Sequence, residues 1–200
     1  MNAVDSIFLS VIIPAYNEQI KIQEDVSLVY EFLNKQTFTF EVLVVDDGSQ
    51  DNTFKIVTSL KPKYKNLRCI HYTPNRGKGH AVKTGMLEAR GEYMLFADAG
   101  TCVPYEETLK GLKLLQEGYD IAIGSRALPD SKIISLQPKY RQFGSKAFAL
   151  IARFLMGVHT IKDLQCGFKF FKQKAPQFSP RGLEPYSKVN YLTVGHSIRK

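Results

Sequence analysis

The chain has 200 residues, of which 44% are hydrophobic and 23% charged, so it can bury the core of one domain and is not disordered as a whole. Its net charge of +8 indicates an anionic partner: a nucleotide, a phospholipid surface or a nucleic acid. Three widely spaced cysteines without a CxxC motif indicate neither a disulfide framework nor a structural zinc site, and they fit a reducing compartment. We expect no signal peptide and no membrane span, because no stretch approaches about 18 apolar residues.

Short apolar, β-branched runs alternate with helical patterns along the first 125 residues. The runs predict strands at 8–13, 41–45, 67–72, 93–97 and 120–123. The intervening segments predict helices at 22–33, from about 53, at 79–90 and at 104–116. Strands of this kind are buried on both faces, so the alternation predicts the α/β class with a mostly parallel sheet flanked by helices.

The composition changes after about residue 127. We expect a C-terminal amphipathic helix at 139–156, and one domain spanning residues 1–175. Residues 176–200 contain three prolines and little periodicity, and we expect them to form an atypical, poorly ordered tail.

Polar clusters follow all five predicted strands. They are 14–18, 46–49, 75–79, Asp98 and 124–126. A single acid after a strand is usually a helix cap, but five such clusters in chain order are poorly explained by capping alone. Ligands of open α/β sheets bind beyond the carboxyl ends of the strands, so these clusters predict a binding site.

The chemistry of the clusters is complementary. Glu18 and Asp47 can accept hydrogen bonds from a base or a ribose, and Arg76 and Lys78 can face phosphates at the start of a helix. Asp98 can hold a hard divalent cation that bridges a diphosphate. A site for a nucleoside diphosphate follows. Neither a P-loop nor a GxGxxG motif is present in the sequence, which disfavours a P-loop NTPase and a dinucleotide dehydrogenase.

Six motifs carry a resemblance to a known family: SVIIPAYNE, VLVVDDGSQDNT, NRGKGHAVKTGM, YMLFADAGT, IAIGSR and DLQCGFKFF. In this order, over residues 8–174, they resemble the family 2 glycosyltransferases of the GT-A fold. The most similar branch transfers glucose or mannose to a polyprenyl (dolichyl) phosphate. The resemblance implies an enzyme that inverts the sugar configuration, takes a UDP-glucose or GDP-mannose type donor and uses Mg²⁺ or Mn²⁺.

The resemblance also assigns roles to single residues. Pro14, Tyr16, Glu18 and Asp47 are expected at the nucleoside, Gly77 and Lys78 near the diphosphate, and Asp98 at the metal. Arg126, Arg141 and Ser145 are expected at the acceptor phosphate, and Asp163 and Gln165 on the acceptor side of the pocket. Asp98, Arg126 and Asp163 are the expected catalytic residues.

The chain departs from the family pattern at two places. Gly100 stands where the family has the second acid of an Asp-x-Asp motif. Because Mg²⁺ usually keeps several waters, we expect a weakened metal site completed by water and donor phosphate oxygens. After Lys174 the sequence no longer resembles the apolar, acid-containing helix of the family. Both departures bear on activity more than on fold.

A phosphate acceptor explains the cations at Arg126 and Arg141, because an anionic acceptor is its own nucleophile and requires positioning rather than a base. A hydroxyl acceptor with Asp163 as base remains an alternative, as does a catalytically silent relative that binds nucleotide sugar. Lys139, Lys146 and Arg153 line one flank of the apolar helix at 139–156, which fits peripheral binding at the cytoplasmic face of a membrane. An ordinary core-packing helix explains that pattern equally well. The basic residues are dispersed, so we expect no nucleic-acid partner.

Overall fold

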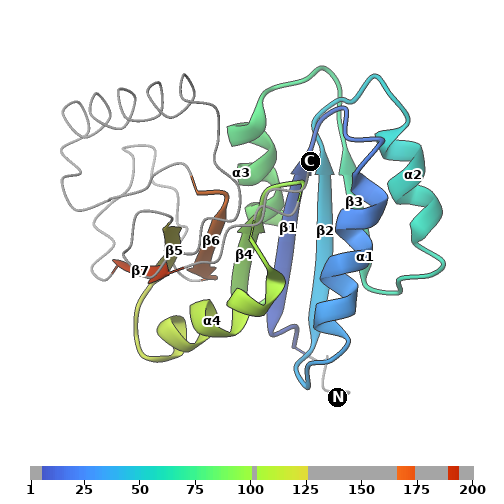
Figure 1. Cartoon of the computed structure of the whole chain (residues 1–200). Coiled ribbons are helices and arrows are strands. Elements are labelled where there is room, and N and C mark those ends of the chain that lie inside the picture. The colour runs from blue at the N-terminus through green and yellow to red at the C-terminus, as the bar shows by residue number, and fades with distance from the viewer. Residues whose placement is uncertain (1–5, 101–102, 126–165, 174–188, 194–200) are drawn as a thin grey trace, which may run out of the picture.

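The structure is a computed structural model that describes residues 6–100, 103–125, 166–173 and 189–193 (Figure 1). In these segments seven strands form one sheet in the order β3-β2-β1-β4-β6-β5-β7. The strands are β1 (Leu9–Ala15), β2 (Phe40–Asp46), β3 (Leu67–His71), β4 (Tyr93–Ala97), β5 (Ile121–Ser125), β6 (Phe168–Lys172) and β7 (Val189–Thr193). Strand β6 is antiparallel to both of its neighbours, and the other pairs are parallel.

Helices follow the first four strands of the described chain. They are α1 (Ile22–Leu33), α2 (Thr53–Leu60), α3 (Lys78–Glu88), the 3₁₀ helix η1 (Tyr105–Glu107) and α4 (Thr108–Gln116). The α/β class is confirmed, and the five strands expected from the sequence lie within two residues of their predicted bounds. The helix expected at 139–156 lies outside the described residues.

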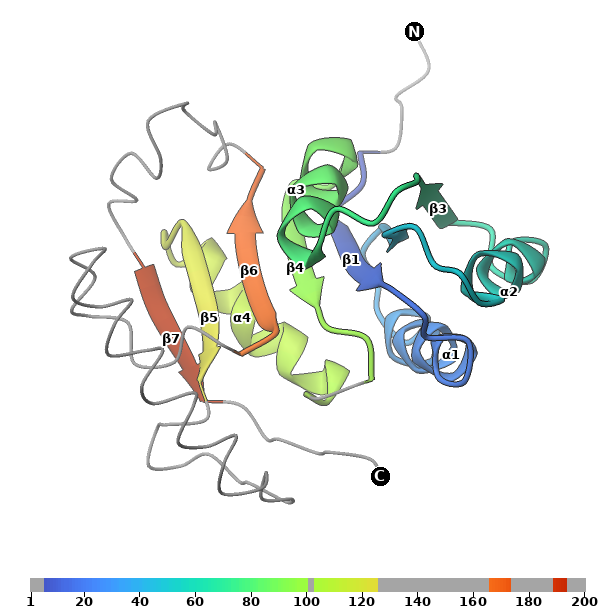
Figure 2. The same cartoon turned by 90° about the horizontal axis from the view of Figure 1, so that it is seen from above.

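Two hydrophobic clusters sandwich the sheet because successive side chains of a strand point to opposite faces. Ile12, Leu43 and Met94 pack on one face with side chains of α3, including Ala81 and Met86. The opposite face of the sheet packs on α1, α2 and α4 through the larger cluster. Figure 2 shows α3 on one side of the sheet and the other three helices on the other side.

This arrangement creates a switch point between β1 and β4. From β1 the chain runs outward to β2 and β3, and it then returns through α3 to β4 on the other side of β1, from where it continues to β5. Connections that leave neighbouring parallel strands in opposite directions open a crevice at their carboxyl ends, where α/β proteins bind ligands. The fold therefore directs the ends of these two strands, Pro14–Ala15 and Asp98, toward one crevice.

Strands β6 and β7 were not expected from the sequence. In β6 Phe168 and Phe170 are buried, and the strand pairs with β4 and β5, although its motif had been recognised only by resemblance. Strand β7 lies in the stretch 176–200 and pairs with β5, so the sheet takes up a strand beyond residue 175. The remaining residues of 176–200 lie outside the described segments, and their expected order stays a prediction. No helix in the described segments is long and apolar enough to cross a membrane.

Candidate functional site

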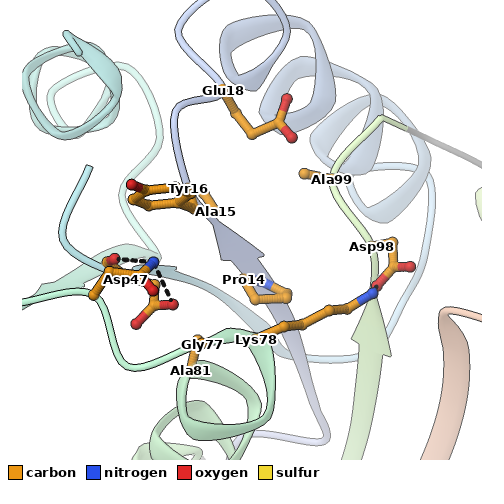
Figure 3. Close-up of a pocket in the computed structure, with 11 residues that line it drawn as sticks. Pro14, Ala15, Tyr16, Glu18, Asp47, Gly77, Lys78, Ala81, Asp98 and Ala99 are labelled. Carbon is orange, nitrogen blue, oxygen red and sulfur yellow. Dashed lines mark hydrogen bonds and ion pairs between the residues drawn. The ribbon is translucent and has the colours of Figure 1, made fainter. Parts of the chain in front are cut away.

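A pocket of about 360 Å³ lies at the carboxyl ends of β1, β2 and β4 and faces the N-terminus of α3 (Figure 3). It is lined by Pro14, Ala15, Tyr16, Glu18, Asp47, Asn75, Gly77, Lys78, Ala81, Asp98 and Ala99. Seven of these residues were expected at the donor from the sequence: Pro14, Tyr16, Glu18, Asp47, Gly77, Lys78 and Asp98. The structure thus brings together side chains that come from four separate sequence motifs.

The loop after β1 is fastened to the loop after β2 by side chains that cap backbone N–H groups. Thr53 Oγ1 accepts the N–H of Glu18 at 2.8 Å, and Asp51 Oδ2 accepts the N–H of Gln19 at 3.1 Å. In the reverse direction, Asn17 Oδ1 accepts the N–H of Gln50 at 2.8 Å. These contacts hold Glu18 at the rim of the pocket, where Figure 3 shows its carboxylate.

Asp47 joins the end of β2 to the loop before α3. Its Oδ2 accepts the Asn75 side-chain amide at 2.9 Å, and its Oδ1 accepts the backbone N–H of Arg76 at 2.9 Å. The next residue, Gly48, has φ +71°, and a Cβ on it would lie 2.8 Å from the backbone nitrogen of Asn75. Only glycine allows the two loops to approach this closely. Because Asp47 binds Asn75 and Arg76, it holds the backbone that leads into Gly77 and Lys78.

Asp46, the residue before Asp47, joins the carboxyl ends of β2 and β3 and the loop that follows β2. Its buried carboxylate lies 2.7 Å from His71 Nδ1 on β3 and accepts hydrogen bonds from the backbone and the hydroxyl of Ser49. Three polar groups at the ends of β2 and β3 are satisfied in this way, so we assign Asp46 a structural role.

The N-terminus of α3 borders the pocket with Gly77, Lys78 and Ala81. Unpaired N–H groups and the helix dipole make such a terminus favourable for an anion, in particular a phosphate. Arg76, which the sequence also suggested for phosphates, lies instead with its guanidinium 5.9 Å from the centre of the Tyr72 ring, and it is not among the lining residues of this pocket. Lys78 is the only cationic side chain among them.

Asp98 follows β4 and is held from two sides. Its backbone N–H donates to the Gly167 carbonyl at 2.9 Å, and its Oδ1 lies 2.7 Å from the Lys78 ammonium nitrogen. A Cβ at position 167 would collide with the Asp98 carboxylate, so a glycine before β6 makes room for it. The antiparallel strand that the sequence did not predict thus determines where the Asp98 carboxylate lies.

Burial raises the pKa of Glu18 above its usual value, and the nearby Asp25 and Asp51 carboxylates act in the same direction, while Lys21 opposes them. The shift favours the neutral acid, so Glu18 accepts a proton more readily than an exposed glutamate does. A bound group that donates a hydrogen bond or carries positive charge would offset this effect.

The charges of the pocket fit a divalent cation together with an anionic ligand. Three carboxylates, those of Glu18, Asp47 and Asp98, line it with one lysine, so a diphosphate alone would meet more negative than positive charge. Within the described segments no cluster of three or more metal-ligating side chains occurs. Of the three carboxylates, Asp98 is the one that would suit a hard cation of this kind, whose other ligands would be oxygens of the bound ligand and of water.

The remaining expected site residues, Arg126, Arg141, Ser145, Asp163 and Gln165, lie outside the described residues. Asn75 and Ala15 line the pocket as members of the predicted clusters 75–79 and 14–18 to which no role had been assigned, and Ala81 and Ala99 line it without having been expected. Asn75 directly precedes the Arg-Gly-Lys motif, and that position was the signal available for it. The alanines carried no signal of this kind in the sequence, because a small side chain contributes to the pocket only through the space that it leaves open.

A mostly parallel sheet between two helix layers, with a polar pocket at the β1–β4 switch point, defines an α/β protein of the GT-A type. A solved structure with this fold supports the class. Glucosyl-3-phosphoglycerate synthase from Mycobacterium tuberculosis, in complex with Mn²⁺, UDP-glucose and phosphoglyceric acid, matches 96% of this chain and 72% of its own with a TM-score of 0.67 at 15% identity.

The chain belongs to glycosyl transferase family 2, whose sequence model matches residues 10–175. It is 38% identical over 185 residues to a dolichyl-phosphate beta-glucosyltransferase of Dictyostelium discoideum, covering 86% of this chain and 56% of that one. It is 39% identical over 180 residues to the mouse protein of the same name, covering 84% and 55%. The chain thus spans a little over half the length of these relatives.

Proposed function

We propose that the chain transfers a sugar, with inversion, from a nucleoside-diphosphate donor to a polyprenyl phosphate of the dolichyl type. The observation that carries the proposal is the convergence of seven expected donor residues in one pocket at the β1–β4 switch point. The names of the two relatives support glucose as the sugar and dolichyl phosphate as the acceptor. The same names favour a donor of the UDP-glucose type over one of the GDP-mannose type.

The donor would lie along the pocket with its base near Tyr16 and Asp47 and its diphosphate at the N-terminus of α3. Tyr16 is partly exposed and gives the base an aromatic wall. Glu18, with its raised pKa, would accept a hydrogen bond from the nucleoside. Gly77 offers backbone without a side chain, and the Lys78 ammonium would pair with a phosphate oxygen.

A divalent cation, Mn²⁺ or Mg²⁺, would be held by Asp98 and would neutralise the charge that develops on the departing nucleoside diphosphate. Lys78 pairs with the Asp98 carboxylate, so the binding of donor and cation would displace the lysine from that carboxylate. When they bind, the lysine is free to turn to the phosphates, and it would contribute to the same charge stabilisation.

The acceptor phosphate would be positioned by Arg126, Arg141 and Ser145. Residues 126–165 carry seven lysines and arginines against two aspartates, whereas residues 6–100 carry eleven of each sign. The positive excess is therefore concentrated on the segment expected to meet a lipid phosphate and the cytoplasmic face of a membrane. An acceptor phosphate attacks the sugar directly, and Asp163 would act as a base only with a hydroxyl acceptor.

The decisive test is a transfer assay with radiolabelled UDP-glucose and a short polyprenyl phosphate, with GDP-mannose and a polyprenol in parallel. Each pair is measured with Mn²⁺, with Mg²⁺ and with a chelator. We expect a lipid-linked β-glucoside that requires the metal and the phosphate. Transfer to the polyprenol instead would favour the hydroxyl acceptor, and an α-linked product would contradict inversion.

The variant Arg141→Lys tests the acceptor site, because lysine keeps the charge but lacks the paired N–H donors of the guanidinium. We expect turnover to fall about ten- to a hundredfold while UDP affinity is unchanged. Lys139→Arg is the matched control on the same predicted helix. Normal turnover by Arg141→Lys would remove this residue from the acceptor site.

One observation favours a second candidate, a silent nucleotide-sugar-binding relative. Position 100 offers no second carboxylate, and Lys78 already neutralises the first. This candidate predicts calorimetric binding of UDP-glucose without transfer to either acceptor, so the same assay separates the two functions.

A further inference from the structure

The buried carboxylate of Asp25 lies against the turn that carries Asp98. Asp25 belongs to the first turn of α1, and only 4% of its surface is exposed. Its Oδ2 accepts the backbone N–H of Gly100 at 2.8 Å, a contact between residues 75 positions apart. A hydrogen bond to a charged acceptor in a buried place is stronger than a neutral one, so this contact restrains the turn.

Gly100 adopts a conformation that this contact depends on. Its φ of +95° is one that side-chain-bearing residues rarely adopt, and among the described residues beyond its chain neighbours no atom lies within 4 Å of where its Cβ would be. The space therefore does not require a glycine, whereas the backbone direction does. With this φ the N–H of Gly100 points toward α1 and meets the Asp25 carboxylate.

Asp98 lies two residues before this contact and is held on its other side by Gly167. The turn 98–100 is thus tied to β6 at one end and to α1 at the other. Helix α1 begins directly after the loop of Glu18, whose carbonyl accepts the N–H groups of Lys21 and Ile22. Asp25 is also close enough to Glu18 to contribute to its raised pKa. The first turn of α1 therefore contacts both sides of the pocket.

We infer that Asp25 is a positioning residue of the metal site: it holds the Asp98 turn through the Gly100 N–H and compensates for the missing second acid at position 100. The inference rests on the proposed donor site and deepens it. In this chain the second carboxylate comes from α1, and it acts on the backbone of the turn rather than on the cation. Its role is to keep Asp98 aimed at the cation when Lys78 leaves.

The test measures UDP affinity by calorimetry with and without Mn²⁺ in four variants. Asp25→Ala and Asp25→Leu remove the acceptor, Asp25→Asn keeps an acceptor of the same shape, and Glu31→Gln is a control acid on the exposed face of α1. We expect the gain in UDP affinity from Mn²⁺ to fall at least tenfold in the first two. It should fall less than about threefold in Asp25→Asn and not at all in Glu31→Gln. UDP affinity without metal should stay within twofold throughout.

A full Mn²⁺ gain in Asp25→Ala or Asp25→Leu would overturn the inference, and so would equal losses in Asp25→Asn and Asp25→Ala. If neither non-accepting variant folds, amide hydrogen exchange of the wild-type chain decides. The Gly100 amide should be protected more than tenfold over an exposed amide, and rapid exchange would refute the contact. A wild-type chain without any Mn²⁺ gain would refute the proposed metal-dependent donor site, while the Gly100 exchange would still report on Asp25.

Discussion

A carboxylate lies at each end of the parallel sheet, and the two carboxylates differ in burial and in their partners. At the amino end, Glu41 of β2 is 2% exposed and accepts Ser10 Oγ at 2.7 Å, an Arg68 guanidinium N–H at 2.8 Å and the Arg90 backbone N–H at 2.7 Å. At the carboxyl end, Asp98 pairs with Lys78, whose side chain is 59% exposed to solvent. A carboxylate with several fixed partners stabilises the fold, whereas one with a movable partner at a pocket is available to a ligand.

The largest expected effect comes from removing the available carboxylate. Asp98→Asn keeps the shape of the side chain but loses its charge, so the cation and the leaving diphosphate lose their anchor. We expect sugar transfer to fall at least about a hundredfold, comparable with the loss of a principal charge-stabilising group. The unfolding free energy should change by less than about 1 kcal/mol, since the Lys78 pair is partly solvated. Chemical denaturation and the transfer assay on one preparation check both halves, and a folded variant with normal turnover would contradict the assignment.

The complementary change removes the fixed carboxylate at the other end of the sheet. Glu41→Ala leaves the Ser10 hydroxyl and the Arg90 backbone N–H without this acceptor, and the Arg68 guanidinium keeps only its contacts with Glu88. The loss should lower the unfolding free energy by about 3 kcal/mol. Urea denaturation measures this loss. Glu31→Ala, which breaks an exposed pair with Lys35, is the matched control and should cost less than about 1 kcal/mol. UDP affinity should be unchanged in both, and a Glu41→Ala chain that is stable but fails to bind UDP would break the comparison.

Glu41, at the amino end of the sheet, should make the free energy of unfolding depend on pH. Burial by itself would raise the pKa of Glu41, but the hydrogen bonds from Arg68, Ser10 and Arg90 outweigh it and hold the pKa below its usual value. Its contribution to stability is therefore complete above the unfolded value of about 4.3 and is lost as the pH falls through the lower folded pKa. Urea denaturation from pH 6 to pH 3 should show this loss, with a shallower slope in Glu41→Gln. Equal slopes would mean that Glu41 is not stabilised as an anion.

A smaller effect is expected when the movable partner is removed. Lys78→Gln should weaken UDP binding without metal about tenfold, since one charge-assisted contact to a phosphate is lost. Binding of Mn²⁺ alone should become tighter, because Asp98 no longer pairs with an ammonium group. Calorimetry with each ligand separately measures both changes, and Lys83→Gln, an exposed lysine on the same helix, is the control. Weaker Mn²⁺ binding in Lys78→Gln would show that the lysine does not compete with the cation.

The smallest expected effect restores an acid at position 100. Gly100→Asp finds open space for its Cβ, but the φ of +95° should strain the backbone by about 1 kcal/mol. We expect Mn²⁺ affinity to rise severalfold while the melting temperature falls by a few degrees. Gly100→Ala carries the same strain without the carboxylate and separates the two effects. No difference in Mn²⁺ affinity between these variants would place the cation away from the turn.

The amino-acid sequence by itself determined the α/β class, five of the strands and the polar clusters that end them. Short, mostly apolar runs rich in β-branched residues are local signals, because a strand buried on both faces can be recognised from its own composition. The convergence of Pro14, Glu18, Asp47 and Asp98 also followed from sequence, since the carboxyl ends of parallel strands meet at one edge.

Only the tertiary structure decided which partners these residues have. Strand β6 is short and contains two lysines among its five residues, so its local signal is weak. Its place in the sheet comes from its pairing with β4, more than seventy residues earlier in the chain. The same pairing sets Gly167 against Asp98, and the packing of α1 brings Asp25 to the Gly100 N–H. Such contacts join segments that share no local period, and they exist only when the sheet and its helices are assembled. The sequence therefore predicted the carboxylates of the site, and the fold decided which of them are held in place and which one is left to a ligand.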